Sequence, residues 1–381
     1  MTFIRHFLIG LFIAGSLLAQ DSTKSGFQFR DLIRLPTTSV KHQGRTGTCW
    51  IFSTISFLET ELLRTGGDSV DLSEMYISRQ IYPLKAQSYV RLHGKATFEE
   101  GGLAHDVIHV LREQGLVPES AYSGMYVEGE KHNHREMIAV LQGALDAIVQ
   151  NRGETLSPVW SDVIEAILDV YLGVPPSQFE LEGKILSPAS FVKSFKINPD
   201  AYVSLTSYLH HPFYQSFVLE VPDNWSRGSF YNLPLDDFMK VIRHALKEGY
   251  SLVWDGDVSE KGCDYEKGIA LLPKKKWEDK TDDEQDSTAV IPEPEIEVTQ
   301  EIRQTCFDNY SSTDDHLMHL IGLAEDQEGT LYFIAKDSDS NRKNPYDGHH
   351  YLSESYMRAK TVSIMVHKDG IQKDIRKKIG L

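Results

Sequence analysis

A loop with two glycines at residues 43–50 runs directly into a helical pattern, and Cys49 lies at the junction. Gly44 and Gly47 permit a tight turn in which the backbone is exposed. The residues that follow repeat with helical spacing, and Gly66 and Gly67 then end the segment. The apolar positions of this helix are Ile51, Ile55, Leu58 and Leu62. This part of the chain is therefore expected to place Cys49 at the N-terminus of a helix.

The position of Cys49 favours chemistry by its thiol. Unpaired N–H groups and the helix dipole stabilise a thiolate at a helix N-terminus. Gln43 lies six residues upstream on the same loop, and its amide is able to donate to a developing oxyanion. A small buried cysteine at a loop-to-helix junction is the alternative interpretation. The combination with Gln43 favours a nucleophile for acyl transfer.

A thiol nucleophile also needs a base, and the chain has 15 histidines, so a histidine alone proves nothing. Residues 314–324 are mostly apolar after two aspartates, which predicts a strand. His316 and His319 then point to opposite faces, and only one of them can face a site. We choose His316, at the start of the strand, and assign His319 to the core. A second strand over residues 331–335 forms a hairpin that returns Asp337 towards His316 as its orienting partner.

Composition excludes several classes of protein. The 381 residues are 41% hydrophobic and 25% charged, which is typical of a globular protein. With 55 acidic and 39 basic residues the net charge is −16, so nucleic acid is not an expected partner. Three cysteines without a Cys-x-x-Cys spacing are too few for a disulfide scaffold or a zinc finger. Cys263 and Cys306 could pair and leave Cys49 free, but the sequence does not show that they are close. No metal or other cofactor is expected.

Residues 1–19 have the composition of a secretory signal peptide. Arg5 and His6 precede an apolar run over residues 7–18, and Ala19 offers a cleavage site. Leu17, at the −3 position, is larger than usual, so an uncleaved anchor is the alternative, although the run is shorter than a membrane span of about 20 residues. Cleavage removes Arg5, which leaves 38 basic against 55 acidic residues and a net charge of −17. The mature protein is expected to be exported, periplasmic or secreted, with no stable membrane anchor.

Several motifs in a fixed order resemble the papain-like cysteine peptidases, and specifically the bleomycin hydrolase/aminopeptidase C branch. The resemblance runs from about residue 27 to the C-terminus. The matching segments are Gln43 with Gly47-Thr48-Cys49-Trp50, then residues 72–76, 101–106, 234–238 and 253–259, and finally Asp315-His316.

The resemblance implies roles for individual residues. Cys49 would be the nucleophile, His316 the general base and acid, and Gln43 the oxyanion donor. Gly101 and Gly102 would pair through their backbone with an extended peptide substrate, since a side chain there would obstruct its approach.

The resemblance also implies an α+β, papain-like, two-lobed fold with one peptidase domain over residues 20–381. The expected parts are a helical lobe at about 40–125, a helical insertion at about 126–230, a β-barrel-like lobe at about 231–370 and a tail at 371–381. Two amphipathic helices, over 137–149 and 159–172, lie in the insertion. In this branch the C-terminal segment lies in the cleft and confines activity to free N-termini, and the subunits form a homo-hexamer.

One segment departs from the family. Where the family has Asn-Ser-Trp-Gly, this chain has Asp337-Ser338-Asp339-Ser340. Asp337 is still expected to accept the Nδ1–H bond of His316, and its charge should favour the imidazolium. The tryptophan that covers this bond in the family is missing at Asp339, which predicts activity that is weakened or shifted in pH.

These observations predict a cysteine peptidase that acts through a Cys49 acyl-enzyme, most simply an aminopeptidase on short peptides. The altered segment at 337–340 motivates an alternative, a degenerate relative that serves as a peptide-binding or scaffold module. Residue patterns do not decide between endopeptidase and exopeptidase action, nor do they reveal side-chain preference.

Overall fold

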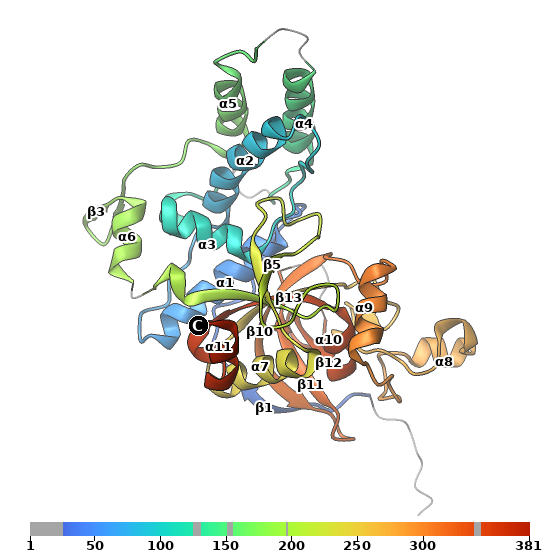
Figure 1. The fold of residues 1–381 in the computed structure, drawn as a ribbon. Coiled ribbons are helices and arrows are strands. Elements are labelled where there is room, and N and C mark those ends of the chain that lie inside the picture. Colours follow the sequence, from blue (N-terminus) through green and yellow to red (C-terminus); the bar gives the residue numbers. More distant parts are fainter. Residues whose placement is uncertain (1–25, 125–130, 151–154, 196, 339–343) are drawn as a thin grey trace, which may run out of the picture.

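A computed structural model describes residues 26–124, 131–150, 155–195, 197–338 and 344–381. The helices of residues 49–194 form one lobe, and a large sheet with the later helices around it forms the other, so the predicted α+β class is confirmed (Figure 1). The helices are α1 (Cys49–Arg64), α2 (Glu74–Arg91), α3 (Ala104–Glu113), α4 (Arg135–Val149), α5 (Trp160–Leu172), α6 (Pro188–Ser194), α7 (Leu235–Lys247), α8 (Asp282–Ser287), α9 (Gln300–Asp308), α10 (Glu354–Lys360) and α11 (Lys373–Ile379). The strands are β1 (Arg30–Arg34), β2 (Phe179–Leu181), β3 (Lys184–Leu186), β4 (Tyr202–Thr206), β5 (Ser216–Val218), β6 (Ser229–Asn232), β7 (Leu252–Gly256), β8 (Cys263–Asp264), β9 (Ile269–Ala270), β10 (His316–Glu325), β11 (Leu331–Lys336), β12 (His349–Ser353) and β13 (Thr361–His367).

Helix α1 is the central element of the helical lobe. The predicted helix begins at Cys49, as expected, and every residue from there to Leu62 is buried. Its apolar positions pack against α2 and α3 in one hydrophobic core. Ser73 caps α2, because its side chain accepts a hydrogen bond from the N–H of Tyr76. A helix enclosed on all sides holds its first residue in a fixed position.

The two helices predicted in the insertion are present as α4 and α5. They pack against α2 in a separate core, at the end of α2 that lies away from the sheet (Figure 1). The insertion is shorter than predicted, however. Strands β4, β5 and β6 all begin before residue 231 and belong to the large sheet, where β4 pairs with β13. They are three to five residues long, which leaves little periodic pattern to detect.

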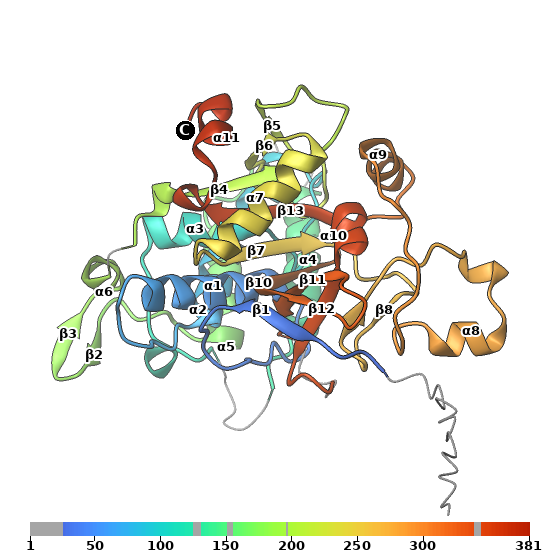
Figure 2. The ribbon, with the colours of Figure 1, turned by 90° about the horizontal axis from the view of Figure 1, so that it is seen from below.

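Strand β10 is central in the sheet, which has 11 strands within the described ranges. Its first half pairs with β7 and its second half pairs with β1, and β11 lies antiparallel along it. The β10–β11 hairpin was predicted, and a turn at residues 326–329 closes it, with Gly329 at φ 83°. Helix α7 packs against one face of β7 and β10 (Figure 2). The hairpin brings residue 337 back to the level of the start of β10.

The C-terminal segment folds as α11 and lies on α7. Ile375 and Ile379 are buried in the same core as α7, and Lys378 pairs with Asp237. The sequence resemblance had implied a tail inside the cleft, which is wrong for this structure, because the apolar face of α11 is buried against the β lobe. Among the described residues no helix is both long and apolar enough to cross a membrane. The predicted signal peptide, residues 1–19, lies outside the described ranges.

Candidate active site

Cys49 is the first residue of α1, and its side chain is 8% exposed. The preceding loop is shaped by glycine at residue 44, where φ is 74° and a Cβ would lie 2.4 Å from the carbonyl oxygen of His132. At the first turn of a helix the backbone N–H groups have no carbonyl partner within the helix, so the N–H of Cys49 is oriented for an anion. The predicted loop-to-helix junction thus presents both a thiol and a backbone donor.

His316 begins β10, and its ring lies between Cys49 and Asp337. The Nε2 atom of His316 is 2.7 Å from Oδ1 of Asp337, and the ring also interacts with the thiol of Cys49. The contact between Asp337 and Nδ1 that was expected from the sequence is therefore wrong. Because Cys49 lies on the other side of the imidazole from Asp337, Nε2 meets the carboxylate and Nδ1 remains for the thiol. Three residues that are far apart in sequence are therefore brought together.

The charges around His316 favour its protonated form, paired with the Asp337 carboxylate. Burial opposes the charged form of His316, but the neighbouring Cys49 and Asp337 outweigh it and raise the pKa of the imidazole well above its ordinary value. Burial alone would raise the pKa of Asp337, yet the charges and hydrogen bonds of His316 and His350 lower it well below its usual range. Asp337 is thus a carboxylate, and it stabilises a proton on His316.

The His316–Asp337 bond is shielded from water although the family's tryptophan is missing. The side chains of His316 and Asp337 are 9% and 2% exposed. The ring of Tyr265 lies edge-on to both His316 and His350, at 6.2 and 4.9 Å between centroids, and His350 Nε2 lies 3.4 Å from Oδ2 of Asp337. The expectation of an uncovered bond is therefore wrong for the described residues, while Asp339 itself lies outside them. Neither Tyr265 nor His350 had a recognisable signal in the sequence.

Gln43 reaches the site through a hydrogen bond to Ser338. The Ser338 hydroxyl donates to Oε1 of Gln43 at 2.7 Å, and Ser338 N–H donates to Oδ1 of Asp337 at 2.7 Å. The Nε2 group of Gln43 donates to the carbonyl of Thr46 at 2.8 Å. An amide nitrogen carries two hydrogens, so one of them is left for an oxyanion. Ser338 thereby links the proposed oxyanion donor to the residue that orients His316.

Gly101 and Gly102 lie against the segment that carries the thiol. The Trp50 indole donates to the carbonyl of Glu100 at 3.0 Å, and a Cβ on Gly102 would lie 2.8 Å from the Trp50 ring. A Cβ on Gly101 would lie 2.2 Å from Oδ2 of Asp223. Packing inside the protein therefore requires both glycines, whether or not a substrate also pairs with them.

Asp223 is the residue near the site that sequence reasoning missed. It lies on the segment 219–228 between β5 and β6, more than 100 residues from Gly101. A proline followed by an aspartate in a polar stretch has the composition of an ordinary turn. Only the packing of the sheet lobe onto the helical lobe brings this carboxylate to the glycines.

The remaining cysteines and the second histidine of β10 have structural surroundings. Cys263 and Cys306 are both free, so the pair left open by the sequence does not form in this structure. His319 is buried, and its Nδ1 lies 2.9 Å from the hydroxyl of Ser56 on α1. Burial lowers its pKa well below the usual value. It packs in the core, away from the Asp337 contact.

Comparison with known proteins agrees with this geometry. The profile of the Peptidase C1-like family matches residues 86–380. Aminopeptidase G of Lactobacillus delbrueckii subsp. lactis is 24% identical, over 89% of this chain and 83% of its own length. Aminopeptidase W of the same organism is 25% identical, over 63% of this chain and 64% of its own length, slightly under two thirds.

One solved structure shares the fold over nearly the whole chain. The crystal structure of PepW from Lactobacillus rhamnosis superposes with a TM-score of 0.73 at 18% identity, and covers 92% of this chain and 84% of the other. The papain-like fold expected from the motifs is thereby confirmed.

Proposed function

Because this chain belongs to the Peptidase C1-like family, we propose that it is a cysteine aminopeptidase that hydrolyses short peptides through an acyl-enzyme on Cys49. The observation that carries this proposal is the position of His316 between the thiol of Cys49 and the carboxylate of Asp337. A nucleophile at a helix N-terminus with an oriented imidazole provides the two groups that thiol-mediated acyl transfer requires.

The chemistry follows from the positions of these groups. The Cys49 thiolate forms a bond to the carbonyl carbon of the substrate, and the displaced electron pair moves onto the carbonyl oxygen. The Cys49 N–H and the free hydrogen of the Gln43 amide stabilise that oxyanion. His316 then gives its proton to the leaving amine as the C–N bond breaks. In the second half, His316 takes a proton from water, which attacks the thioester and releases the acid and the thiol.

Two facts support an aminopeptidase over a protein that only binds peptides. The thiol, the imidazole and an ionised orienting group are together in one buried cluster. Several relatives are named aminopeptidases. The substitution of aspartate for asparagine at residue 337 leaves an acceptor in place, so it does not remove the function of that position.

The test is an active-site titration with a peptidyl electrophile that reacts with thiols, together with hydrolysis of aminoacyl coumarin amides. We expect stoichiometric labelling and turnover in the wild type, and loss of both in Cys49→Ala. A Cys263→Ser/Cys306→Ser variant is the matched control, because it removes the other two free thiols and should keep full activity. A wild type that is folded but neither labels nor turns over would favour the peptide-binding alternative.

Export and assembly are also proposed. The composition of residues 1–19 supports cleavage after Ala19, and N-terminal sequencing of the protein from the exported fraction should begin at Gln20. A full-length N-terminus there would support an anchor instead. The resemblance to the bleomycin hydrolase branch supports a homo-hexamer, which sedimentation analysis would test.

A further inference from the structure

We propose that Asp223 binds the α-ammonium group of the substrate and closes the cleft beyond it, so that only peptides with a free N-terminus are cleaved. This inference rests on the proposed function, because it names the residue that selects substrates for the Cys49 site.

Asp223 touches both walls of the site. Its two carboxylate oxygens would lie 2.2 and 2.3 Å from a Cβ on Gly101, so the carboxylate rests directly on the glycine backbone of the helical lobe. Its own N–H donates to Oδ2 of Asp314 at 3.2 Å, and Asp314 comes two residues before His316. A peptide that ran along Gly101 and Gly102 towards Cys49 would therefore meet the Asp223 carboxylate.

The segment that presents Asp223 is held firmly. The Asn224 side chain donates to the carbonyls of Leu219 and Gly228, at 2.8 and 3.0 Å, and accepts from the N–H of Gly228 at 2.7 Å. Gly228 in turn lies against the ring of His105 on α3, where a Cβ would be 2.4 Å from Nε2. These contacts fix the short loop that carries Asp223, and a recognition group held in this way loses little conformational entropy on binding.

The cation nearest to the Asp223 carboxylate, Lys85, uses its hydrogen bonds elsewhere. Within the described part of the chain no hydrogen bond to its oxygens is formed. The nearby Lys85 ammonium donates to the carbonyls of Glu99 and Gly101 instead. An α-ammonium group carries three N–H donors and a positive charge, and it would supply what this partly buried carboxylate lacks.

The surrounding charges favour a second cation. The charged groups that face Asp223 from the elements around it are Lys85, Glu99, Asp106, Asp255 and Asp314. Lys85 is the single cation in this set. Burial raises the pKa of Asp223 to about 6, although Lys85 opposes the shift. A bound ammonium group would lower that pKa again, and substrate affinity should therefore rise with pH through about 6.

The experiment compares aminoacyl coumarin amides with free and N-acetylated amino groups, in the wild type and in Asp223→Asn and Asp223→Ala. For free substrates we expect Asp223→Asn to lower kcat/KM by about 10- to 100-fold, mainly through KM, because a charge-assisted hydrogen bond is lost. In Asp223→Asn the substrate affinity should no longer rise as the pH increases through about 6. Asp223→Ala should in addition accept acetylated substrates, since the barrier is removed. Asp374→Asn, an exposed carboxylate on α11, is the matched control and should behave like the wild type.

The outcomes separate this inference from the proposed function. If Asp223→Asn keeps the wild-type preference for free N-termini, Asp223 is not the amine site, even though the enzyme is a cysteine peptidase. If the wild type cleaves acetylated substrates equally well, the inference is likewise overturned. Failure of the Cys49 titration in the wild type would instead reject the proposed function itself.

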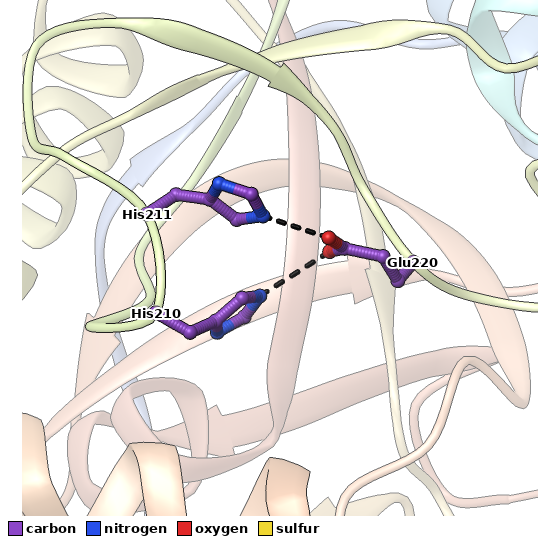
Figure 3. A group of neighbouring side chains, drawn as sticks. All are labelled: His210, His211 and Glu220. Atoms are coloured by element: carbon purple, nitrogen blue, oxygen red, sulfur yellow. Dashed lines mark hydrogen bonds and ion pairs between the residues drawn. The ribbon is translucent and has the colours of Figure 1, made fainter.

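Away from the Cys49 site, the geometry points to a zinc site at His210, His211 and Glu220. The two Nε2 atoms converge on the two carboxylate oxygens of Glu220, at 3.2 and 2.7 Å (Figure 3). All three donor atoms lie within 4.8 Å of one another. Two imidazole nitrogens and one carboxylate oxygen are a ligand set that suits Zn²⁺, with water in the remaining position. No metal was expected from the sequence, which lacks a Cys-x-x-Cys spacing; here a loop and strand β5 separate Glu220 from the two histidines.

Neighbouring side chains hold the imidazole rings of His210 and His211 in place. His211 stacks on Phe217 with 4.0 Å between centroids, and His210 lies parallel to Phe307 at 5.6 Å. The amide Nε2 of Gln304 lies 3.0 Å from Nδ1 of His210 and also donates to Oδ1 of Asp308 at 2.8 Å, which further fixes the orientation of the His210 ring. Fixed imidazoles at an accessible surface lose little conformational entropy when an ion binds.

Zinc binding should be measured by calorimetric titration with ZnCl₂, and by the rise in Tm, in the Cys49→Ala protein, so that the catalytic thiol cannot bind the ion. We expect His211→Ala and Glu220→Gln to weaken binding by at least about 10-fold, whereas His244→Ala on α7 should leave it unchanged. Each variant must keep its Tm without zinc. Absence of zinc binding in the parent protein, or equal binding in His211→Ala, would overturn this inference.

Discussion

The Nε2 atom of His316 meets the Oδ1 atom of Asp337 at 2.7 Å, and this contact turns the other ring nitrogen towards Cys49. An aspartate in this position does more than orient the ring. Its negative charge shares a buried site with the imidazole and holds the proton there. The pH dependence of the enzyme should therefore report on Asp337 directly.

Asp337→Asn should move the alkaline limb of kcat/KM to lower pH. The catalytic ion pair is lost when His316 gives up its proton, so activity falls as pH rises through the His316 pKa. Asp337 contributes to raising that pKa well above its ordinary value, and a neutral amide would no longer do so. Profiles of kcat/KM against pH from 5 to 10 check this, and an unchanged alkaline limb would count against the electrostatic role.

Gln43→Ala should lower kcat by about 100- to 1,000-fold, because one oxyanion donor is removed. Labelling of Cys49 by a small alkylating reagent should continue, since the thiol and His316 are untouched. Ser338→Ala is the companion variant. It removes the 2.7 Å bond that holds Oε1 of Gln43 and should give a smaller loss of kcat. Equal kcat in Gln43→Ala and the wild type would exclude Gln43 as the donor.

Tyr265→Ala should expose the His316–Asp337 bond to water and reduce kcat/KM by about 10-fold or more. The shielding comes from the ring, which lies 6.2 Å from that of His316, so Tyr265→Phe should retain most of the activity. If both variants lose activity equally, the hydroxyl group is required and shielding by the ring is not the explanation.

Gly101→Ala and Gly102→Ala should each destabilise the fold by about 1–3 kcal/mol, because a Cβ has no room at either position. The added Cβ would meet a different side chain at each glycine, so a second substitution can relieve one clash and leave the other. Asp223→Ala should restore stability to Gly101→Ala, whose clash is with the Asp223 carboxylate, but not to Gly102→Ala, whose clash is with Trp50. Urea unfolding of the four variants measures the effect, and rescue of both glycine variants would contradict the assigned contacts.

The C-terminal helix should contribute stability and have no part in substrate selection. Ile375→Ala should cost about 2–5 kcal/mol, because Ile375 is fully buried with α7. Removal of Leu381, which is 43% exposed, should leave both stability and the preference for free N-termini unchanged. A loss of that preference on removing Leu381 would show that the chain terminus reaches the cleft during catalysis.

The sequence was most informative where chemistry and local structure coincide. The apolar repeat from Ile51 to Leu62 determined α1, and the loop before it placed Cys49 at the helix N-terminus. The hairpin of β10 and β11 could be predicted in the same way, and with it the approach of Asp337 to His316. The short strands β4 to β6 were missed, since strands of three to five residues carry little pattern.

By itself the sequence predicted Cys49 as the nucleophile and His316 as the base, and it determined the papain-like fold and the family. Only the tertiary structure decided which nitrogen of His316 faces Asp337, which rings cover that bond, and where the C-terminal helix lies. It alone brought Asp223 onto Gly101, across 122 residues of chain. The physical reason is that helix and strand patterns arise from neighbouring residues, whereas the orientation of a ring and the partner of a carboxylate depend on how two lobes pack together.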